Sequence, residues 1–156
     1  MILMRLVVGP LQVNCYILAD EKTKEAVVID PGDDAQDILS IVRKKGLTVK
    51  YIVNTHAHFD HVGANGELKE ATGAEILLHE ADAALLGSTS GMAGTFGMKA
   101  PASPKADRYL KQGDVITAGE VLLRTNNGLG ASTAESPTIV SAGATLSLGN
   151  FAGPGG

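Results

Sequence analysis

Three of the four histidines in this sequence lie close together, in the segment Thr55–His61 (THAHFDH). His56 and His58 are two residues apart just past an extended apolar run, so both imidazoles can point to the same side. Paired imidazoles suit zinc, which takes nitrogen ligands at about 2.0–2.1 Å. Asp60 and His61 follow at the turn into the next expected helix, and their different direction favours a second metal beside the first.

A two-metal site of this kind predicts hydrolytic chemistry. Two ions about 3.5–4 Å apart can hold a bridging hydroxide and polarise a carbonyl. Zinc also brings the pKa of a bound water close to 7, which provides a nucleophile without serine or cysteine. The competing interpretation is a surface loop whose histidines bind no metal. The clustering of imidazoles beside an aspartate at a strand end favours the metal site.

The residues before this segment are typical of a sheet with helices. Runs rich in branched apolar residues predict an antiparallel meander over Ile2–Val8, Val13–Ala19 and Ala26–Ile29. A helix then begins at a cap, Asp33 or Asp34, and carries Ile38, Leu39, Ile41 and Val42 at helical spacing before Gly46 ends it.

The segment with the histidines is expected between a strand and a helix. Val49–Asn54 is the predicted strand and Gly63–Thr72 the predicted helix, followed by a strand at Glu75–Leu78 and a short helix at Glu80–Leu86. This alternation of strands and helices predicts helices layered on a sheet.

The second half changes in composition. Residues 87–106 are rich in Gly, Ser, Ala and Pro, which predicts a flexible loop over the site. Residues 114–124 read as a hairpin, and 138–142 and 144–148 as two weak strands. We therefore expect one domain over residues 1–156, of which 126–156 are atypical or incomplete.

Composition narrows the class of protein. The chain has 156 residues, a net charge of −4 and no basic patch, so we expect no nucleic-acid partner. The sequence shows neither a signal-peptide layout nor a membrane-spanning apolar stretch, so we expect no association with a membrane and a cytoplasmic location. Cys15, the single cysteine, cannot form an internal disulfide and is expected to be a buried small apolar residue.

The segment His56-x-His58-x-Asp60-His61 resembles the HxHxDH signature of the metallo-β-lactamase superfamily. The resemblance to its small glyoxalase II-like hydrolases covers about residues 1–125. It is carried by five segments in order: GPLQVNCYIL (Gly9–Leu18), VIDPG (Val28–Gly32), VNTHAHFDHVGAN (Val53–Asn65), GAEILLHEAD (Gly73–Asp82) and ADRYLKQGDVI (Ala106–Ile116). It implies an α/β (α+β) fold, a four-layer αββα sandwich, complete or truncated. The site would lie at one edge, where loops from strand ends converge.

The resemblance also implies roles for individual residues. His56 and His58 would bind a first zinc, and Asp60 and His61 a second, with Asp60 also catalytic because it orients the attacking hydroxide. Asp30 would support the metal-binding loop from behind, as partners of metal ligands commonly do. The implied cofactor is Zn²⁺, one or two ions, with iron or manganese as alternatives. The implied substrate is a small-molecule thioester or related acyl compound.

Three ligands of the family are missing from their expected places. Gly128 stands where the third histidine of the first zinc belongs, and Ala144 or Asn150 where an aspartate should bridge both metals. A late histidine would lie beyond residue 156. Three interpretations remain open: an active hydrolase with an unusual site, an inactive or weakly metal-binding relative, and a sequence altered or incomplete after about residue 125.

Some other residues have two interpretations each. His79, with Glu80 or Asp82, could replace a ligand, but a surface histidine at a strand-to-helix turn is the favoured interpretation. Lys99, Lys105 and Arg108 could meet an acidic substrate such as glutathione, whereas a solvated face is favoured. Tyr16 and Tyr51 are expected in the sheet or core.

Two expectations concern the whole protein. The helical domain with which larger glyoxalase II enzymes hold glutathione has no room in this sequence, so glutathione specificity is not expected. If residues 126–156 do not complete the second sheet, apolar core would be exposed and the chain should form a homo-oligomer.

Overall fold

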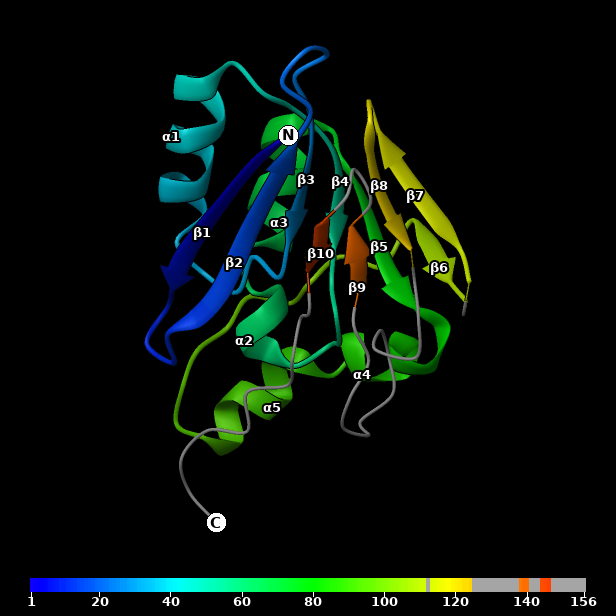
Figure 1. Ribbon diagram of the computed structural model, residues 1–156. Coiled ribbons are helices and arrows are strands. Elements are labelled where there is room, and N and C mark those ends of the chain that lie inside the picture. Colours follow the sequence, from blue (N-terminus) through cyan, green and yellow to red (C-terminus); the bar gives the residue numbers. More distant parts are fainter. Residues whose placement is uncertain (112, 125–137, 141–143, 147–156) are drawn as a thin grey trace.

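The computed structural model describes residues 1–111, 113–124, 138–140 and 144–146. Two β-sheets lie face to face, and helices cover the outer side of the larger sheet (Figure 1). The larger sheet has six strands in the order β1-β2-β3-β4-β5-β6, and the smaller has four in the order β10-β9-β8-β7. The smaller sheet is antiparallel throughout.

The larger sheet changes from antiparallel to parallel at β3. Its strands are β1 (Ile2–Val8), β2 (Val13–Ala19), β3 (Glu25–Ile29), β4 (Thr48–Val53), β5 (Glu75–His79) and β6 (Arg108–Leu110). β1, β2 and β3 form an antiparallel meander, as the sequence predicted, and β3 to β6 pair in parallel. The carboxyl ends of β3, β4 and β5 therefore meet at one edge, where ligands commonly bind.

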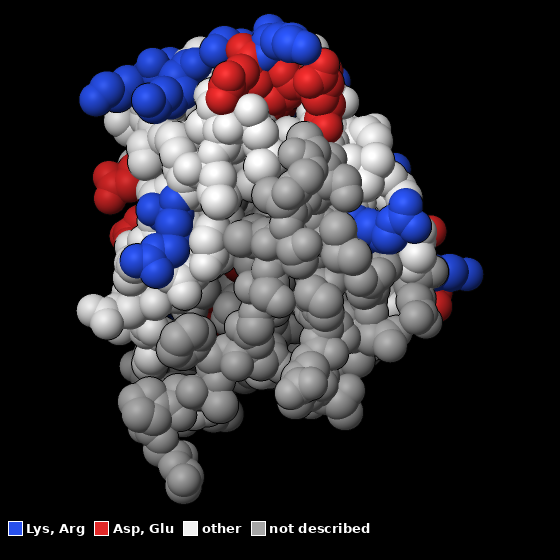
Figure 2. Space-filling view, in the orientation of Figure 1, with Lys and Arg blue, Asp and Glu red and all other residues white. Residues whose placement is uncertain are grey.

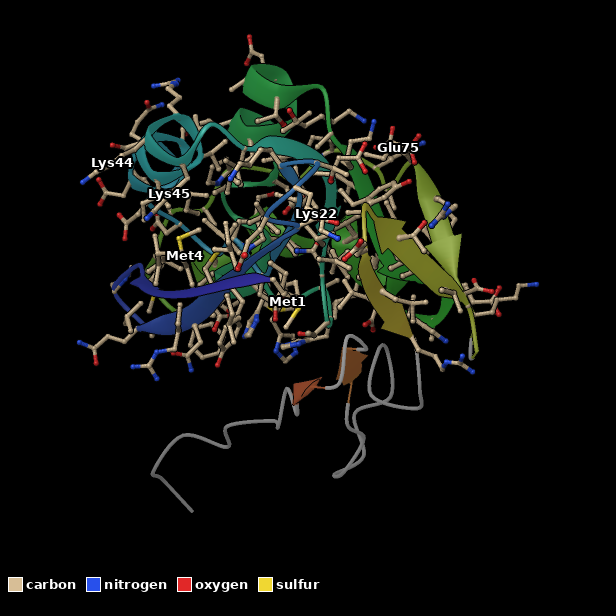
Figure 3. All side chains as sticks on the ribbon, turned by 45° about the horizontal axis from the view of Figure 1, so that its top comes forward. Met1, Met4, Lys22, Lys44, Lys45 and Glu75 are labelled. Carbon is tan, nitrogen blue, oxygen red and sulfur yellow. The ribbon has the colours of Figure 1, made fainter. Side chains whose placement is uncertain are left out.

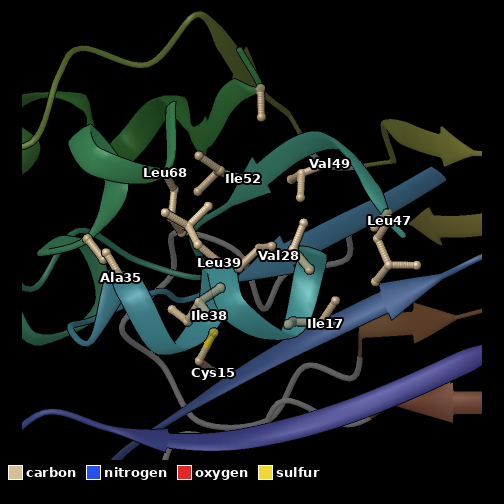
Figure 4. Packing of buried hydrophobic residues seen from close by; sticks show 14 of the residues in the cluster. Cys15, Ile17, Val28, Ala35, Ile38, Leu39, Leu47, Val49, Ile52 and Leu68 are labelled. Carbon is tan, nitrogen blue, oxygen red and sulfur yellow. The ribbon is translucent and has the colours of Figure 1, made fainter. Parts of the chain in front are cut away.

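Helices α1 (Ala35–Lys45) and α3 (Asn65–Thr72) bury apolar side chains against the larger sheet. Ile38 and Leu39 of α1 pack on Ile17 and Val28 of the strands, with Leu68 of α3 in the same cluster (Figure 4). The thiol of Cys15 lies in this cluster with no exposed surface, and its burial raises the pKa of the thiol. The prediction that Cys15 is a buried small apolar residue is thus confirmed.

The other face of the larger sheet packs on the smaller sheet, whose strands are β7 (Val115–Ala118), β8 (Val121–Arg124), β9 (Thr138–Val140) and β10 (Ala144–Leu146). Leu18, Ile29 and Leu77 form this second core with Ile116 and Leu123. Tyr16 and Tyr51 pack at its margin, as expected for sheet residues. The hairpin predicted at 114–124 is confirmed. Strands β9 and β10 lie within the predicted strands at 138–142 and 144–148, whose other residues are outside the described part of the chain.

A polar contact fixes one sheet on the other. Asp20, which is buried in the β2–β3 turn, accepts a hydrogen bond from the backbone N–H of Glu120 in the β7–β8 turn. Gly119 in that turn has a φ of 58°, and a Cβ there would lie 2.5 Å from Oδ2 of Asp20. Charged side chains gather at this end of the molecule (Figure 2), where Lys22 pairs with Glu120. Lys44 and Lys45 at the end of α1 point away from the sheets (Figure 3).

The remaining helices are short and lie near the edge formed by the carboxyl ends of the strands (Figure 1). They are α2 (Phe59–Val62), the 3-10 helix η1 (Glu80–Asp82), α4 (Ala83–Leu86) and α5 (Thr89–Thr95). No helix among the described residues is long and apolar enough to cross a membrane. The layers seen in the described part are helices, larger sheet and smaller sheet; a helical layer outside the smaller sheet is not among these residues.

Three local predictions were wrong in detail. The helix predicted over Gly63–Thr72 begins at Asn65, and the separate α2 precedes it. The loop predicted over 87–106 contains α5, which is anchored by the buried Thr89 and Ala93. Asp34 does precede α1, but its carboxylate accepts the backbone N–H of Gly9 at 2.8 Å and does not cap the helix.

Candidate metal centre

Asp30 and the segment with the histidines meet because β3 and β4 are parallel neighbours. Asp30 directly follows β3, is 5% exposed and has a φ of 49°, which the short polar side chain of aspartate tolerates. Its Oδ1 accepts the backbone N–H of Thr55 at 2.7 Å, and its Oδ2 accepts the hydroxyl of Thr55 at 2.6 Å. One carboxylate thus holds the start of the segment from behind, as the resemblance implied for Asp30.

Thr55 in turn orients His56. The Oγ1 of Thr55 lies 3.0 Å from Nδ1 of His56. Because the single hydroxyl proton of Thr55 goes to Asp30, its oxygen can only accept at His56, and Nδ1 must carry the proton. The lone pair of His56 is then on Nε2, the atom that faces His58 and is free to bind a metal.

His56 and His58 have the spacing of two ligands of one ion. Nε2 of His56 lies 3.1 Å from Nδ1 of His58, and the ring centroids are 4.5 Å apart. Two nitrogens at this separation can each lie about 2.0–2.1 Å from one zinc ion, with an angle of about 100° at the metal. That angle is close to tetrahedral, so the residues present fit a zinc ion.

His61 and Asp60 form a second pair beside the first. The ring of His61 lies 4.0 Å from that of His56. Its Nδ1 is 3.1 Å from Oδ2 of Asp30, which leaves Nε2 on the side of Asp60, 3.7 Å from the Asp60 carboxylate. Both side chains are about one-fifth exposed, so this side of the cluster can be reached from solvent.

The pKa values of His56 and His61 are shifted in opposite directions. Burial, with His61 nearby, lowers the pKa of His56 to about 4, which keeps this ring neutral as a metal ligand must be. Burial alone would also lower the pKa of His61, but the contact with Asp30 and the charge of Asp60 raise it above its ordinary value.

All four residues of the predicted site thus lie in one cluster, arranged as two pairs. Within the described residues, no three His, Cys, Asp or Glu side chains are grouped to hold a single ion. Of the positions where further ligands were sought, Gly128 and Asn150 lie outside the described residues, and Ala144 begins β10.

His79 lies apart from the pairs, at the turn from β5 into η1. Its Nδ1 accepts the backbone N–H of Ala81 at 3.2 Å, which occupies that nitrogen. Asp82 lies near both His79 and His58; burial raises the pKa of its carboxyl, while those two imidazoles act against the shift. Oδ2 of Asp82 is buried and has no hydrogen-bond partner within the described part of the chain.

Two buried asparagines support the segment from the inside, and sequence reasoning did not identify them. Asn54 donates to the backbone oxygen of His61 at 3.1 Å and exchanges hydrogen bonds with Asn65. Asn65 also donates to Oγ of Ser103 at 2.9 Å. Both asparagines are fully buried. The sequence signal was a polar residue at the end of an apolar strand, which commonly indicates a structural hydrogen bond.

Two glycines allow the backbone around α2 to pack without side chains. A Cβ on Gly32 would lie 1.7 Å from the backbone oxygen of Asp60, and one on Gly63 would lie 2.3 Å from the oxygen of Gly32. The loop after β3 therefore touches the backbone of the metal segment directly. Gly63 thus lies between α2 and α3, in a backbone contact with the loop after β3, and not inside the helix predicted from this residue.

Comparison with known proteins agrees with this architecture. The sequence model of the metallo-β-lactamase superfamily matches residues 8–139. The chain is 35% identical over 112 residues to the hydroxyacylglutathione hydrolase GloC of Haemophilus influenzae, covering 71% of this chain and 50% of that protein.

Two solved structures are similar in fold. The BLEG-1 B3 metallo-β-lactamase has a TM-score of 0.70 and 30% identity, covering 79% of this chain and 59% of that one. TTHA1623, solved in a di-iron-bound form, has a TM-score of 0.68 and 33% identity, covering 78% and 59%. This chain spans about half the length of the curated relatives it matches. Its fold, its paired histidines and these similarities agree: the chain belongs to the metallo-β-lactamase superfamily and is similar to its glyoxalase II-like hydrolases.

Proposed function

We propose that this protein is a metal-dependent hydrolase of thioesters or related acyl compounds. The observation that carries the proposal is the 3.1 Å separation between Nε2 of His56 and Nδ1 of His58, with the tautomer of His56 fixed by Thr55. When bound, a zinc ion would supply a water of near-neutral pKa and would polarise the substrate carbonyl.

We assign metal-binding, catalytic and positioning roles to individual residues. His56 and His58 would hold the first metal, and Asp60 and His61 the second. Asp60 is the proposed catalytic residue, because its partly exposed carboxylate can accept a hydrogen bond from the attacking water or hydroxide and so orient it. Asp30 reaches both pairs, through Thr55 on one side and Nδ1 of His61 on the other, and acts as a positioning residue.

Two relatives support the reaction class and the kind of metal. One is a hydroxyacylglutathione hydrolase, which favours thioester cleavage. Another was solved with two irons, so the proposed Zn²⁺ has iron as its first alternative and manganese as its second. We propose a small molecule as the substrate, and we propose neither a nucleic-acid partner nor binding to a membrane.

A second candidate is a relative that binds metal weakly and does not turn over substrate. It is favoured by the absence, within the described residues, of any third side chain that completes either pair. Catalytic zinc sites typically have three protein ligands, so two would give a weaker site.

The test compares wild type with His58→Ala after reconstitution with zinc, iron or manganese. Metal per chain and thioester hydrolysis are measured together. The hydrolase predicts at least one ion per chain and hydrolysis that His58→Ala abolishes. His79→Ala is the matched control, since His79 lies outside the pairs, and it should keep both. Substoichiometric metal with no turnover in wild type would leave only the second candidate.

A further inference from the structure

Asp82 has an unpaired carboxylate oxygen beside the segment Thr55–His61. It belongs to the 3-10 helix η1, which follows β5, and its Oδ2 is buried with no hydrogen-bond partner within the described part of the chain. The carboxylate faces the backbone N–H of Ala57 and lies near the imidazoles of His58 and His79. A buried carboxylate oxygen without a donor costs free energy, and such oxygens are rare in folded proteins.

The parallel pairing of β4 and β5 brings Asp82 to His58. The last paired residues of these strands are Val53 and Leu77. Each chain continues for five more residues from the same edge of the larger sheet, one to His58 and the other to Asp82. The helices that follow, α2 and α4, lie at the same end of the molecule (Figure 1). Ala57 is fully buried in a cluster with residues on both sides of Asp82 in the sequence, which holds the two segments together.

His79 does not supply the missing donor. Its Nδ1 accepts the backbone N–H of Ala81, so the proton of a neutral His79 ring lies on Nε2. This N–H makes no hydrogen bond to Oδ2 of Asp82. The other ring near this oxygen is that of His58.

The position of the proton on His58 accounts for the unpaired oxygen. His56 carries its proton on Nδ1, so its Nε2 is an acceptor. In the 3.1 Å contact between the rings, the proton must then lie on Nδ1 of His58, and Nε2 of His58 has none to donate. A neutral imidazole that binds a metal through Nδ1 has the opposite tautomer, with its proton on Nε2. Ligation by His58 would therefore create a donor beside Asp82.

We propose that Asp82 is a positioning residue that accepts the Nε2–H of His58 when Nδ1 of His58 binds the metal. The inference rests on the proposed function for the ligand role of His58. The hydrogen bond fixes the tautomer and the orientation of the ring and makes Nδ1 a stronger ligand. Two carboxylates then hold the segment Thr55–His61, Asp30 after β3 and Asp82 after β5.

The first measurement is zinc affinity, determined by competition with a chelator. Asp82→Leu removes the acceptor and should weaken zinc binding about 10–100-fold. Asp82→Asn keeps a neutral acceptor oxygen and should lose less affinity, because a charged acceptor makes the stronger hydrogen bond. Glu80→Leu is the matched control in the same 3-10 helix. Glu80 is exposed and its Oε2 lies 3.8 Å from Nζ of Lys111, so this change should alter the affinity less than twofold.

The second measurement detects the hydrogen bond itself, which a merely structural role of Asp82 would not produce. Protein with 15N-labelled histidine is loaded with zinc, and the Nε2 proton of His58 is assigned by NMR as the signal missing in His58→Gln. In wild type and in Glu80→Leu this proton should exchange slowly with water, because it is bonded to Asp82. In Asp82→Leu it should exchange too fast to be observed.

The outcomes separate this inference from the proposed function. Equal zinc affinity in wild type and Asp82→Leu, or an Nε2 proton that exchanges alike in both, would overturn the role of Asp82 and leave the hydrolase standing. A slowly exchanging proton that depends on Asp82, in a protein that hydrolyses no thioester, would support that role and reject the hydrolase. A wild type that binds no zinc would reject both. If Asp82→Leu does not fold, Asp82→Asn against Glu80→Gln provides the same comparison.

Discussion

The smallest functional unit of this protein is a chain of hydrogen bonds, Asp30 to Thr55 to His56. Because Asp30 takes the only hydroxyl proton of Thr55, the imidazole of His56 must donate from Nδ1 and present Nε2 to a metal. The four metal-ligating candidates were predictable from their types and spacing. The role of Thr55 was not, because it depends on the parallel pairing of β3 and β4, which brings Asp30 within reach.

This chain of contacts predicts how Thr55 affects metal binding. Thr55→Val removes the hydroxyl but keeps the shape, so the tautomer of His56 is no longer fixed. Zinc affinity should fall about 10–100-fold, the range found when partners of metal ligands are lost. Titration with a competing chelator measures it. Thr55→Ser retains the hydroxyl and should bind like wild type; equal losses in both variants would rule out the role of the hydroxyl.

The lowered pKa of His56 predicts a pH dependence for the metal-free protein. His56 titrates near pH 4 when folded and near 6.5 when unfolded, so between these values only the unfolded chain binds the proton. The contribution of His56 to the free energy of unfolding therefore falls as the pH drops from about 6.5 towards 4. His61 acts in the opposite direction, because its pKa is raised in the folded protein. Its contribution to the free energy of unfolding is present at low pH and is lost as the pH rises through the raised pKa of His61.

Urea unfolding at pH 7 and pH 5 tests this prediction. His56→Gln removes the titrating ring, so the variant should lose less stability between the two pH values than wild type does. A loss of the same size in both proteins would show that His56 is not held neutral by burial.

At the scale of elements, close backbone packing holds the metal segment in place. The loop between β3 and α1 contacts the start of α2 through Gly32 and Gly63, and Asn54 and Asn65 fasten the other side. Strands β1 to β5 and α1 were predicted nearly to the residue, because their apolar spacing and the final Gly46 are local signals. The short strand β6 was not predicted. The contact of Gly32 with Asp60 and Gly63 was not predicted, since it joins segments about 30 residues apart in the sequence.

Gly32→Ala should displace the backbone of Asp60, because the added Cβ would lie 1.7 Å from its carbonyl oxygen. We expect a loss of about 2 kcal/mol or more in the free energy of unfolding, together with weaker metal binding. Chemical denaturation and metal titration measure the two effects. Gly91→Ala is the control, since nothing lies within 4 Å of a Cβ there; similar effects in both variants would contradict the packing argument.

Asn65→Ala should weaken the attachment of two segments, the metal segment at Asn54 and the segment around Ser103. It leaves buried groups of Asn54 unpaired and frees Ser103, which we expect to cost about 1–3 kcal/mol of stability. Hydrogen exchange should also become faster in residues 98–106. If exchange in that segment stays as in wild type, Asn65 does not connect it to the metal segment.

At the scale of the whole molecule, the two-sheet architecture brings sequence-distant loops to one edge. The fold family was predictable from the sequence because its motifs occur in order along the first 125 residues. The bridge from Asp20 to Glu120 was not, because it joins turns about 100 residues apart.

The larger sheet also leaves an apolar strip at its edge. Leu3 and Val7 of the edge strand β1 are 49% and 53% exposed, although β9 and β10 extend the smaller sheet. Exposed apolar edge strands favour association, so we expect the sedimentation coefficient to rise with protein concentration. A single monomeric species at all concentrations would contradict this.

The central claim is that the imidazoles of His56 and His58 share one metal ion. Crystals of zinc-reconstituted protein, with data collected on both sides of the zinc absorption edge, test it most directly. We predict an anomalous peak about 2.0–2.1 Å from both Nε2 of His56 and Nδ1 of His58. A peak elsewhere on the chain, or none between these two rings at saturating zinc, would contradict the account.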